Sequence, residues 1–109
     1  DYRIIVIDRI PQGVMIRERP KEGFLTNATD GDPELKYQAT GVPQEMLDLA
    51  VRASDALTAD TAGVDIAVVD DDMYVFECNL FYGFERFKQV TGVNVAEKLI
   101  RMLENRIKL

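Results

Sequence analysis

Runs of apolar residues broken by polar turns divide the chain into strands and helices. Short runs rich in β-branched residues predict strands, and apolar positions three or four residues apart predict helices. In chain order the pattern predicts strands over 2–8, 14–19 and 35–39, a helix that opens at 43 and fades near 57–60, strands over 64–69 and 73–79, and a final helix that begins at 94.

The connecting segments carry turn and capping residues. Residues 8–13 contain Pro and Gly and predict a hairpin turn, and residues 83–85 predict an irregular turn. Residues 21–42 form a long irregular stretch, which in a compact domain is often a binding loop. Asn94, followed by Glu97 three residues later, has the spacing of a capping box. The order of elements predicts an α+β fold in which an antiparallel sheet has its helices packed on one side.

Length and composition describe a globular domain. The chain has 109 residues, of which 47% are hydrophobic and 29% charged, so it is one domain or part of a larger protein. Because Asp1 directly precedes a strand, we expect residues 1–109 to be a fragment, or the C-terminal domain, of a longer protein. No signal peptide precedes the first strand, and no apolar run approaches the ~20 residues that cross a bilayer. A reduced, cytoplasmic location is therefore expected.

Charge and residue types exclude several kinds of function. Thirteen basic against nineteen acidic residues give a net charge of -6, which argues against nucleic acid or an anionic membrane as a partner. The absence of His excludes a His-based triad and a His zinc site. The single Cys, Cys78, excludes an internal disulfide and a multi-Cys metal cluster.

Two acids and an amide interrupt the apolar strands of the second predicted hairpin; they are Asp65, Glu77 and Asn79. If this hairpin is centred on Asp71, residues whose numbers sum to 142 face each other, and Asp65 lies opposite Glu77. Directly opposed Cβ atoms are ~4.5–5.5 Å apart. Asn79 shares strand parity with Glu77, so the three side chains are expected on one patch with Ala67 and Val75 beside them.

Such a patch is suited to a hard divalent cation. Two close carboxylates repel each other unless a cation or a shared proton lies between them. Oxygen ligands favour Mg²⁺ or Mn²⁺, and Mg²⁺ usually fills its remaining positions with phosphates and water. The alternatives are that the acids are solvated strand residues or are paired with Arg. The acidic run 70–72 is more simply explained as a solvated loop than as a weak Ca²⁺ site.

Other side chains offer weaker signals. Arg3, Arg17, Arg19 and Lys21 could gather on one face and neutralise phosphoryl charge, or could be exposed strand residues. Thr26 and Asn27 could contact a nucleotide, although turn formation is the more frequent role of Asn. The thiol of Cys78 is expected to point away from the metal patch and to be structural. The aromatic residues Phe81, Tyr82, Phe84 and Phe87 are expected in the core, with base stacking as the minor alternative.

Several segments in order resemble the C-terminal part of an ATP-grasp ligase of the RimK-like group, which add glutamate or related amino acids to a carboxylate. The segments are Lys21-Glu22-Gly23, Thr26-Asn27, Ala62-Gly63-Val64-Asp65-Ile66, Glu77-Cys78-Asn79, Gly83-Phe84 and Thr91-Gly92-Val93-Asn94-Val95-Ala96-Glu97-Lys98. The resemblance covers nearly the whole chain, and it implies that residues 1–109 are the C-terminal ATP-grasp subdomain of a longer enzyme.

This resemblance implies a site and a reaction. Asp65, Glu77 and Asn79 would hold Mg²⁺ (or Mn²⁺) against the phosphates of ATP, and Asp1, Thr26 and Asn27 would contact the nucleotide. The enzyme would be an ATP-dependent carboxylate–amine ligase that acts through an acyl phosphate. Its partners would be ATP, a carboxylate, an amine and the N-terminal subdomains of the same protein, without which the fragment should be inactive. Oligomeric state is left open, with a homo-oligomer as one alternative.

The sequence also departs from the family's pattern. Leu25 occupies the position where the family has an Arg before its Thr-Asn pair, and Glu18 aligns with an Arg on the family's second strand. Leu80-Phe81-Tyr82 replaces the small residues and Pro that follow the family's Asn. These departures motivate a second hypothesis, a degenerate ATP-grasp-like module that binds nucleotide or protein without ligase activity. A third, simpler hypothesis is an acidic cation-binding domain that binds no nucleotide.

Overall fold

The computed structural model describes residues 1–18 and 36–107. Five strands form one antiparallel sheet in the order β3-β2-β1-β4-β5. The strands are β1 (Tyr2–Ile7), β2 (Ile10–Glu18), β3 (Lys36–Ala39), β4 (Thr61–Val69) and β5 (Asp72–Asn79), and the helices are α1 (Gln44–Ala56), α2 (Glu85–Thr91) and α3 (Val95–Arg106). The α+β class and the antiparallel sheet are confirmed.

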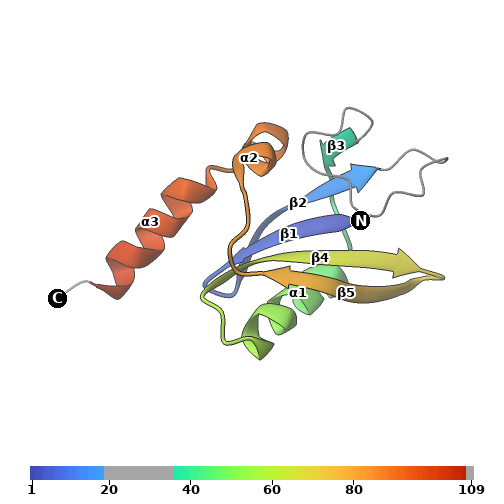
Figure 1. The fold of residues 1–109 in the computed structure, drawn as a ribbon, viewed down its shortest axis with the longest axis horizontal. Helices are drawn as coiled ribbons and strands as arrows, with labels where there is room; N and C mark the ends of the chain where they lie inside the picture. Colours follow the sequence, from blue (N-terminus) through green and yellow to red (C-terminus); the bar gives the residue numbers. More distant parts are fainter. Residues whose placement is uncertain (19–35, 108–109) are drawn as a thin grey trace.

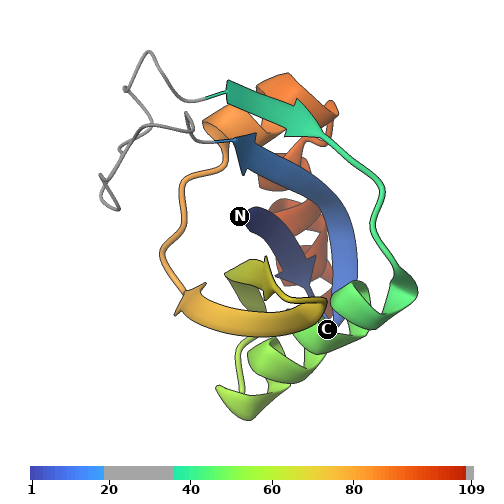
Figure 2. The same ribbon diagram turned by 90° about the vertical axis from the view of Figure 1, so that its right-hand side faces the viewer.

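The helices lie on both faces of the sheet, whereas the sequence analysis expected them on one side. Figures 1 and 2 show α1 against one face and α2 with α3 against the other. The reason is visible in β1, where consecutive residues are all buried: Ile4 and Val6 pack in the α1 core, while Ile5 and Ile7 pack in the core with α2 and α3. A central strand buried on both faces reads as a continuous apolar run rather than an alternating one.

Two tight turns close the hairpins β1–β2 and β4–β5. Asp8-Arg9 and Asp70-Asp71 have positive φ angles at both positions, 51° and 67° in each turn. Such two-residue turns match the twist of the strands that they connect. The first turn is therefore shorter than the predicted 8–13, and β2 begins at Ile10. The acidic run 70–72 is exposed; Asp70 and Asp71 form the second turn, and Asp72 begins β5.

The helix α2 is absent from the sequence prediction, which placed only an irregular turn in this region. The side chain of Phe87 in α2 is 1% exposed, and its ring packs over Gly13 of β2. A Cβ added at Gly13 would lie 3.4 Å from the Phe87 Cζ atom. The helix ends at Gly92, whose φ of 79° is left-handed. Two apolar residues three apart, Phe87 and Val90, are the only helical signal in this short segment, and both pack in the second core.

The predicted limits of the other helices hold closely. Pro43 directly precedes α1, which ends at Ala56. The side chain of Asn94 accepts a hydrogen bond from the Glu97 amide at 3.2 Å, so the expected cap of α3 is present. No helix among the described residues is long and apolar enough to cross a membrane.

Candidate functional site

The predicted acids lie on neighbouring strands of the α2 face. Asp65 of β4 is directly opposite Glu77 of β5 and, on its other side, directly opposite Arg3 of β1. Asn79 is opposite Gly63, so it lies on the same face two residues further along β5. Directly opposed residues in an antiparallel pair project to the same side of the sheet. The predicted convergence of Asp65, Glu77 and Asn79 on one face is thus confirmed.

A β-bulge decides which residue faces Asp65. Ile66 pairs with Val75 and Asp65 pairs with Glu77, which leaves Phe76 as the extra residue on β5. In an unbroken ladder Phe76 would face Asp65, and Glu77 would project toward the buried α1 core. The expectation that Val75 lies beside the acids is wrong, because Val75 packs against the α1 core on the opposite face.

Asp65 is buried and firmly oriented. Its side chain is 2% exposed, and its two carboxylate oxygens accept hydrogen bonds from the Arg3 Nε and Nη2 atoms at 2.7 and 2.8 Å. A two-pronged guanidinium–carboxylate pair fixes both distance and plane. Of the alternatives left open by the sequence, pairing of an acid with Arg therefore applies to Asp65. Each oxygen keeps acceptor capacity beyond its bond to Arg3.

Glu77 and Asn79 are more accessible than Asp65. Glu77 is exposed and Asn79 is half-buried. The Asn79 Oδ1 atom accepts a hydrogen bond from the Phe81 amide at 3.0 Å, which shapes the turn that leaves β5. Among residues 1–18 and 36–107 no three His, Cys, Asp or Glu side chains are grouped so as to hold a metal by themselves. The donor set of two carboxylates and one amide fits a hard cation that takes its other ligands from phosphate and water.

The basic side chains of β1 and β2 share this face, as one alternative predicted. Arg3 is opposite Met15, and Arg17 follows two residues later on the same side of β2. Arg17 pairs through two nitrogens with the carboxylate of Asp1, which begins the chain beside it. The predicted residues Arg19, Lys21, Thr26 and Asn27 lie outside the described residues.

A cavity opens between this charged face and the start of α2. Its lining includes Asp1, Arg3 of β1, Arg17 of β2, Asp65 of β4, Tyr37 of β3 and Arg86 of α2. The guanidinium carbon of Arg86 lies 4.9 Å from the centre of the Tyr37 ring. Arg86 and Tyr37 were not among the predicted site residues, because β3 and α2 are distant in the sequence and only the tertiary structure brings them together.

The segment after β5 is anchored over Gly63. A Cβ on Gly63 would lie 2.9 Å from the Tyr82 Cβ atom, so only Gly permits this approach. The hydroxyl of Thr61 donates to the Val6 carbonyl oxygen at 2.9 Å, so the Tyr82 hydroxyl is the donor in its 2.5 Å bond to Thr61. Burial raises the pKa of Tyr82 and keeps it protonated. Tyr82 and Phe87 are buried as expected, whereas Phe81 is 95% exposed and not in the core.

The thiol of Cys78 faces away from the acids, as predicted. It packs against the α1 core, and burial followed by the nearby charge of Asp65 raises its pKa. A raised pKa lowers the fraction of reactive thiolate. Cys78 is therefore placed as a structural residue.

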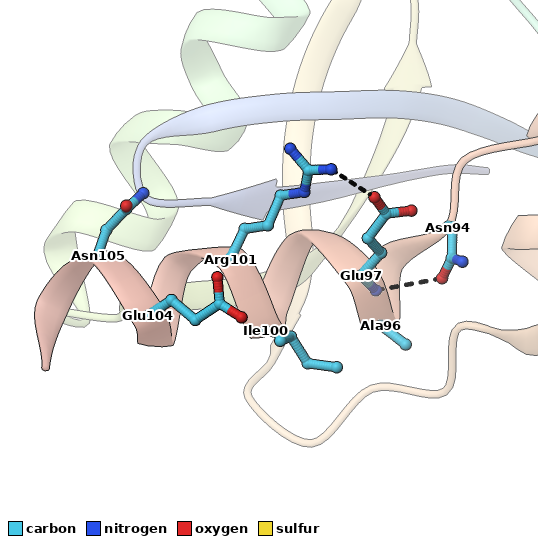
Figure 3. Close-up of a pocket in the computed structure, with 7 residues that line it drawn as sticks. All are labelled: Asn94, Ala96, Glu97, Ile100, Arg101, Glu104 and Asn105. Carbon is cyan, nitrogen blue, oxygen red and sulfur yellow. Dashed lines mark hydrogen bonds and ion pairs between the residues drawn. The ribbon is translucent and has the colours of Figure 1, made fainter. Parts of the chain in front are cut away.

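A second, open groove follows α3 and lies apart from these acids. Figure 3 shows the ion pair between Glu97 and Arg101. Glu104 lies further along the same helix and also lines the groove. The ion pair between Glu97 and Arg101 is exposed and spans one helical turn. The groove has no side chain in common with the candidate site.

Comparison with known proteins agrees with this geometry. The sequence matches the RimK-like ATP-grasp domain over residues 1–103. The chain belongs to the RimK-like ATP-grasp family. It is 35% identical over 107 residues to a protein of Mannheimia succiniciproducens named as an alpha-L-glutamate ligase, covering 98% of this chain and 35% of that protein. It is 36% identical over 90 residues to the ribosomal protein bS6–L-glutamate ligase of Escherichia coli O81, covering 82% of this chain and 29% of that protein.

Solved structures show the same fold. The ATP-grasp ligase PsnB, in complex with a phosphomimetic variant of its minimal precursor, Mg and ADP, superposes with a TM-score of 0.76 at 22% identity, covering 98% of this chain and 32% of that one. The D-alanine–D-alanine ligase of Bacillus anthracis complexed with ATP gives a TM-score of 0.66 at 21% identity, covering 93% and 37%. The RimK-like chain described here spans about a third of the length of its curated relatives.

Proposed function

We propose that the protein containing this chain is an ATP-dependent carboxylate–amine ligase, and that Asp65, Glu77 and Asn79 hold its Mg²⁺ (or Mn²⁺) and ATP. The observation that supports this most directly is the pairing of Asp65 with Glu77 across β4 and β5, on the face that also carries Asn79. Family membership supports the class of reaction, since relatives are named as glutamate ligases.

The residues present fit the divalent cation. Asp65 supplies a buried carboxylate already oriented by Arg3, and Glu77 supplies an exposed one. Asn79 adds an amide oxygen at the same end of the hairpin. When bound, the cation would neutralise negative charge on the transferring phosphoryl group. Two carboxylates alone make a sparse set, which is suited to a metal that arrives together with ATP phosphates.

The chain's own residues would position and compensate charge. Arg3 holds the Asp65 carboxylate in one plane, and Arg17 pairs in the same way with Asp1, which would contact the nucleotide, as the family resemblance implies. Thr26 and Asn27 would contribute further nucleotide contacts, as the family resemblance implies. No side chain of this chain need act as a covalent nucleophile, because phosphoryl transfer depends mainly on positioning and electrostatic stabilisation.

The reaction would proceed in two steps. A carboxylate oxygen of the substrate attacks the γ-phosphorus of ATP, so that an acyl phosphate forms and ADP leaves. The nitrogen of the amine then attacks the acyl carbon, the C–O bond to phosphate breaks, and the amine loses a proton. By analogy with the named relatives, we propose an amino acid such as L-glutamate as the amine and a protein or peptide carboxyl group as its acceptor.

The test uses the full-length protein with ATP, Mg²⁺ and L-glutamate, together with a panel of carboxylate acceptors, and measures release of phosphate. Asp65→Asn and Glu77→Gln are each expected to lower the rate at least about a hundredfold, because each removes a carboxylate proposed to hold the divalent cation against the reacting phosphates. Asp72→Asn and Glu45→Gln are matched controls at exposed positions and should retain wild-type rates.

A second candidate function is the degenerate module that binds nucleotide or protein without ligation. The exposed Leu80 and Phe81 beside the site favour it, since they replace small residues of the family's pattern and present apolar surface. Nucleotide binding by the full-length protein, with phosphate release at background across the panel, would support this alternative. Metal binding that nucleotide does not improve would instead favour the simple cation-binding domain.

A further inference from the structure

The segment that joins β5 to α2 turns back over the sheet directly after Asn79 (Figure 1). Its first contact is local, since the Oδ1 atom of Asn79 accepts a hydrogen bond from the Phe81 amide at 3.0 Å. The next residue, Tyr82, lies against Gly63 of β4, where an added Cβ would be 2.9 Å from the Tyr82 Cβ and 3.2 Å from its Cγ. Because Gly63 is directly opposite Asn79 across β4 and β5, Tyr82 is fixed beside the proposed metal ligand.

Tyr82 is held by the interior of the sheet. Its side chain is 9% exposed and packs in the core that contains Ile5 and Phe87. Its hydroxyl donates to the Thr61 Oγ1 atom at 2.5 Å, and the Thr61 hydroxyl donates in turn to the Val6 carbonyl oxygen at 2.9 Å. The end of the turn is therefore tied to β4 and, through Thr61, to β1.

This anchor matters for the orientation of Asn79. The Phe81 N–H group decides which atom of the Asn79 amide faces the turn, because the oxygen accepts hydrogen bonds and the NH₂ group only donates them. The same oxygen keeps a second acceptor position for a cation. Leu80 is 47% and Phe81 95% exposed, so their side chains add little packing that could hold the turn. The place of the Phe81 amide thus depends on Tyr82.

We propose that Tyr82 is a positioning residue for the metal site. By resting on Gly63 and bonding to Thr61, it holds the Phe81 amide, which directs the Oδ1 atom of Asn79 to the divalent cation. This inference rests on the proposed function and deepens it, since Tyr82 itself would touch neither the cation nor ATP. Tyr82 belongs to the segment in which the sequence departs from the family's pattern, so the anchor is a property of this chain.

The test measures Mn²⁺ binding by the full-length protein in the presence of a non-hydrolysable ATP analogue. Tyr82→Phe keeps the ring and removes only the hydroxyl, and Thr61→Val removes its acceptor. Each should weaken Mn²⁺ binding at least about threefold, because groups that orient a ligand contribute to metal affinity. In an Asn79→Ala background the same substitutions should change the affinity less than about twofold, since the ligand that they orient is gone. A general loss of stability would not depend on Asn79.

Two controls match the two substitutions. Tyr2→Phe removes a tyrosine hydroxyl on the α1 face, and Thr91→Val removes a hydroxyl that donates to the Phe87 carbonyl oxygen at 2.7 Å in α2. Both should bind Mn²⁺ like the wild type. A second readout needs no metal: by nuclear magnetic resonance, the Phe81 amide hydrogen should exchange faster in Tyr82→Phe than in the wild type or in Tyr2→Phe.

The proposal is overturned if Tyr82→Phe and Thr61→Val both keep wild-type Mn²⁺ affinity, if they weaken it equally with and without Asn79, or if exchange of the Phe81 amide is unchanged. In these cases Asp65→Asn and Glu77→Gln still weaken Mn²⁺ binding when the proposed function is correct. Failure of the proposed metal site would appear differently, as wild-type Mn²⁺ affinity in those two variants as well.

Discussion

Arg3 and Asp65 face each other across β1 and β4 and share a two-pronged ion pair, with Nε–Oδ1 and Nη2–Oδ2 distances of 2.7 and 2.8 Å. The Asp65 side chain is 2% exposed and that of Arg3 is 21% exposed. Removing one partner of a buried pair leaves the other charge buried and uncompensated. The resulting loss of stability is larger than the net stabilisation that the intact pair provides. The carboxylate proposed to bind metal thus depends on Arg3 for both its orientation and its burial.

Arg3→Ala should lower the free energy of unfolding by about 2–3 kcal/mol. This is a small loss for the removal of one partner of a buried ion pair, because Arg3 keeps some contact with water. Urea unfolding of the protein measures this change. Arg101→Ala, which breaks the exposed pair with Glu97, is the control and should cost less than about 1 kcal/mol. An Arg3→Met, Asp65→Leu double variant should recover most of the stability, and equal losses from Arg3→Ala and Arg101→Ala would contradict the account.

Gly63→Ala should destabilise the turn that follows β5. The added Cβ would lie 2.9 Å from the Cβ atom of Tyr82, so the segment carrying Tyr82 must move. Overpacking of this kind typically costs about 1–3 kcal/mol. Thermal unfolding checks the prediction, with Gly41→Ala as the control because a Cβ at Gly41 meets nothing within 4 Å. A Gly63→Ala variant as stable as Gly41→Ala would show that Tyr82 is not fixed in this position.

Arg106 should hold the end of α3 against the turns of the sheet. Its guanidinium bonds to Asp8 at 2.6 Å and to Asp60 at 2.8 Å, and these partners raise its pKa. Arg106→Ala is expected to accelerate amide hydrogen exchange in the last turn of α3, and added salt should do the same in the wild type. Arg101→Ala, on the same helix, should leave that turn unchanged. Unaltered exchange in Arg106→Ala would mean that apolar packing alone holds the helix.

Cys78 should react slowly with alkylating reagents at pH 8. Burial and the charge of Asp65 raise its pKa, so the thiolate fraction of the folded protein is smaller than that of an ordinary thiol and grows as the pH rises. Mass spectrometry of the Cys78 peptide after timed iodoacetamide treatment measures the rate. The same peptide in urea-unfolded protein should react faster, and equal rates before and after unfolding would contradict the assignment.

The sequence predicted the pairing of Asp65 with Glu77 although it could not reveal the local geometry. The prediction centred the hairpin on Asp71, whereas the turn is Asp70-Asp71 and the centre lies half a residue earlier. The bulge at Phe76 then shifts the register back by one, so the two differences cancel at the site. A bulge depends on side-chain packing against both cores, which strand parity does not encode.

The part of the site that α2 and β3 form could not be predicted from the sequence, for a similar reason. The helix α2 has seven residues, and its period is marked only by one buried and one half-buried apolar position, so its pattern resembles a turn. The contact between Arg86 and Tyr37 joins residues nearly fifty positions apart, and only tertiary structure brings them together. By contrast, Pro43, Asn94 and Glu97 act on their nearest neighbours, and the helix limits that they predicted are confirmed.

The most direct test of the central claim is the affinity of the full-length protein for Mn²⁺ in the presence of a non-hydrolysable ATP analogue, measured by electron paramagnetic resonance. Asp65→Asn and Glu77→Gln should each weaken Mn²⁺ binding at least about tenfold, because each removes one of two carboxylates from the ion, while Asp72→Asn at the start of β5 should bind like the wild type. Wild-type Mn²⁺ affinity in a folded Asp65→Asn or Glu77→Gln variant would contradict the assignment of this hairpin as the metal–nucleotide site.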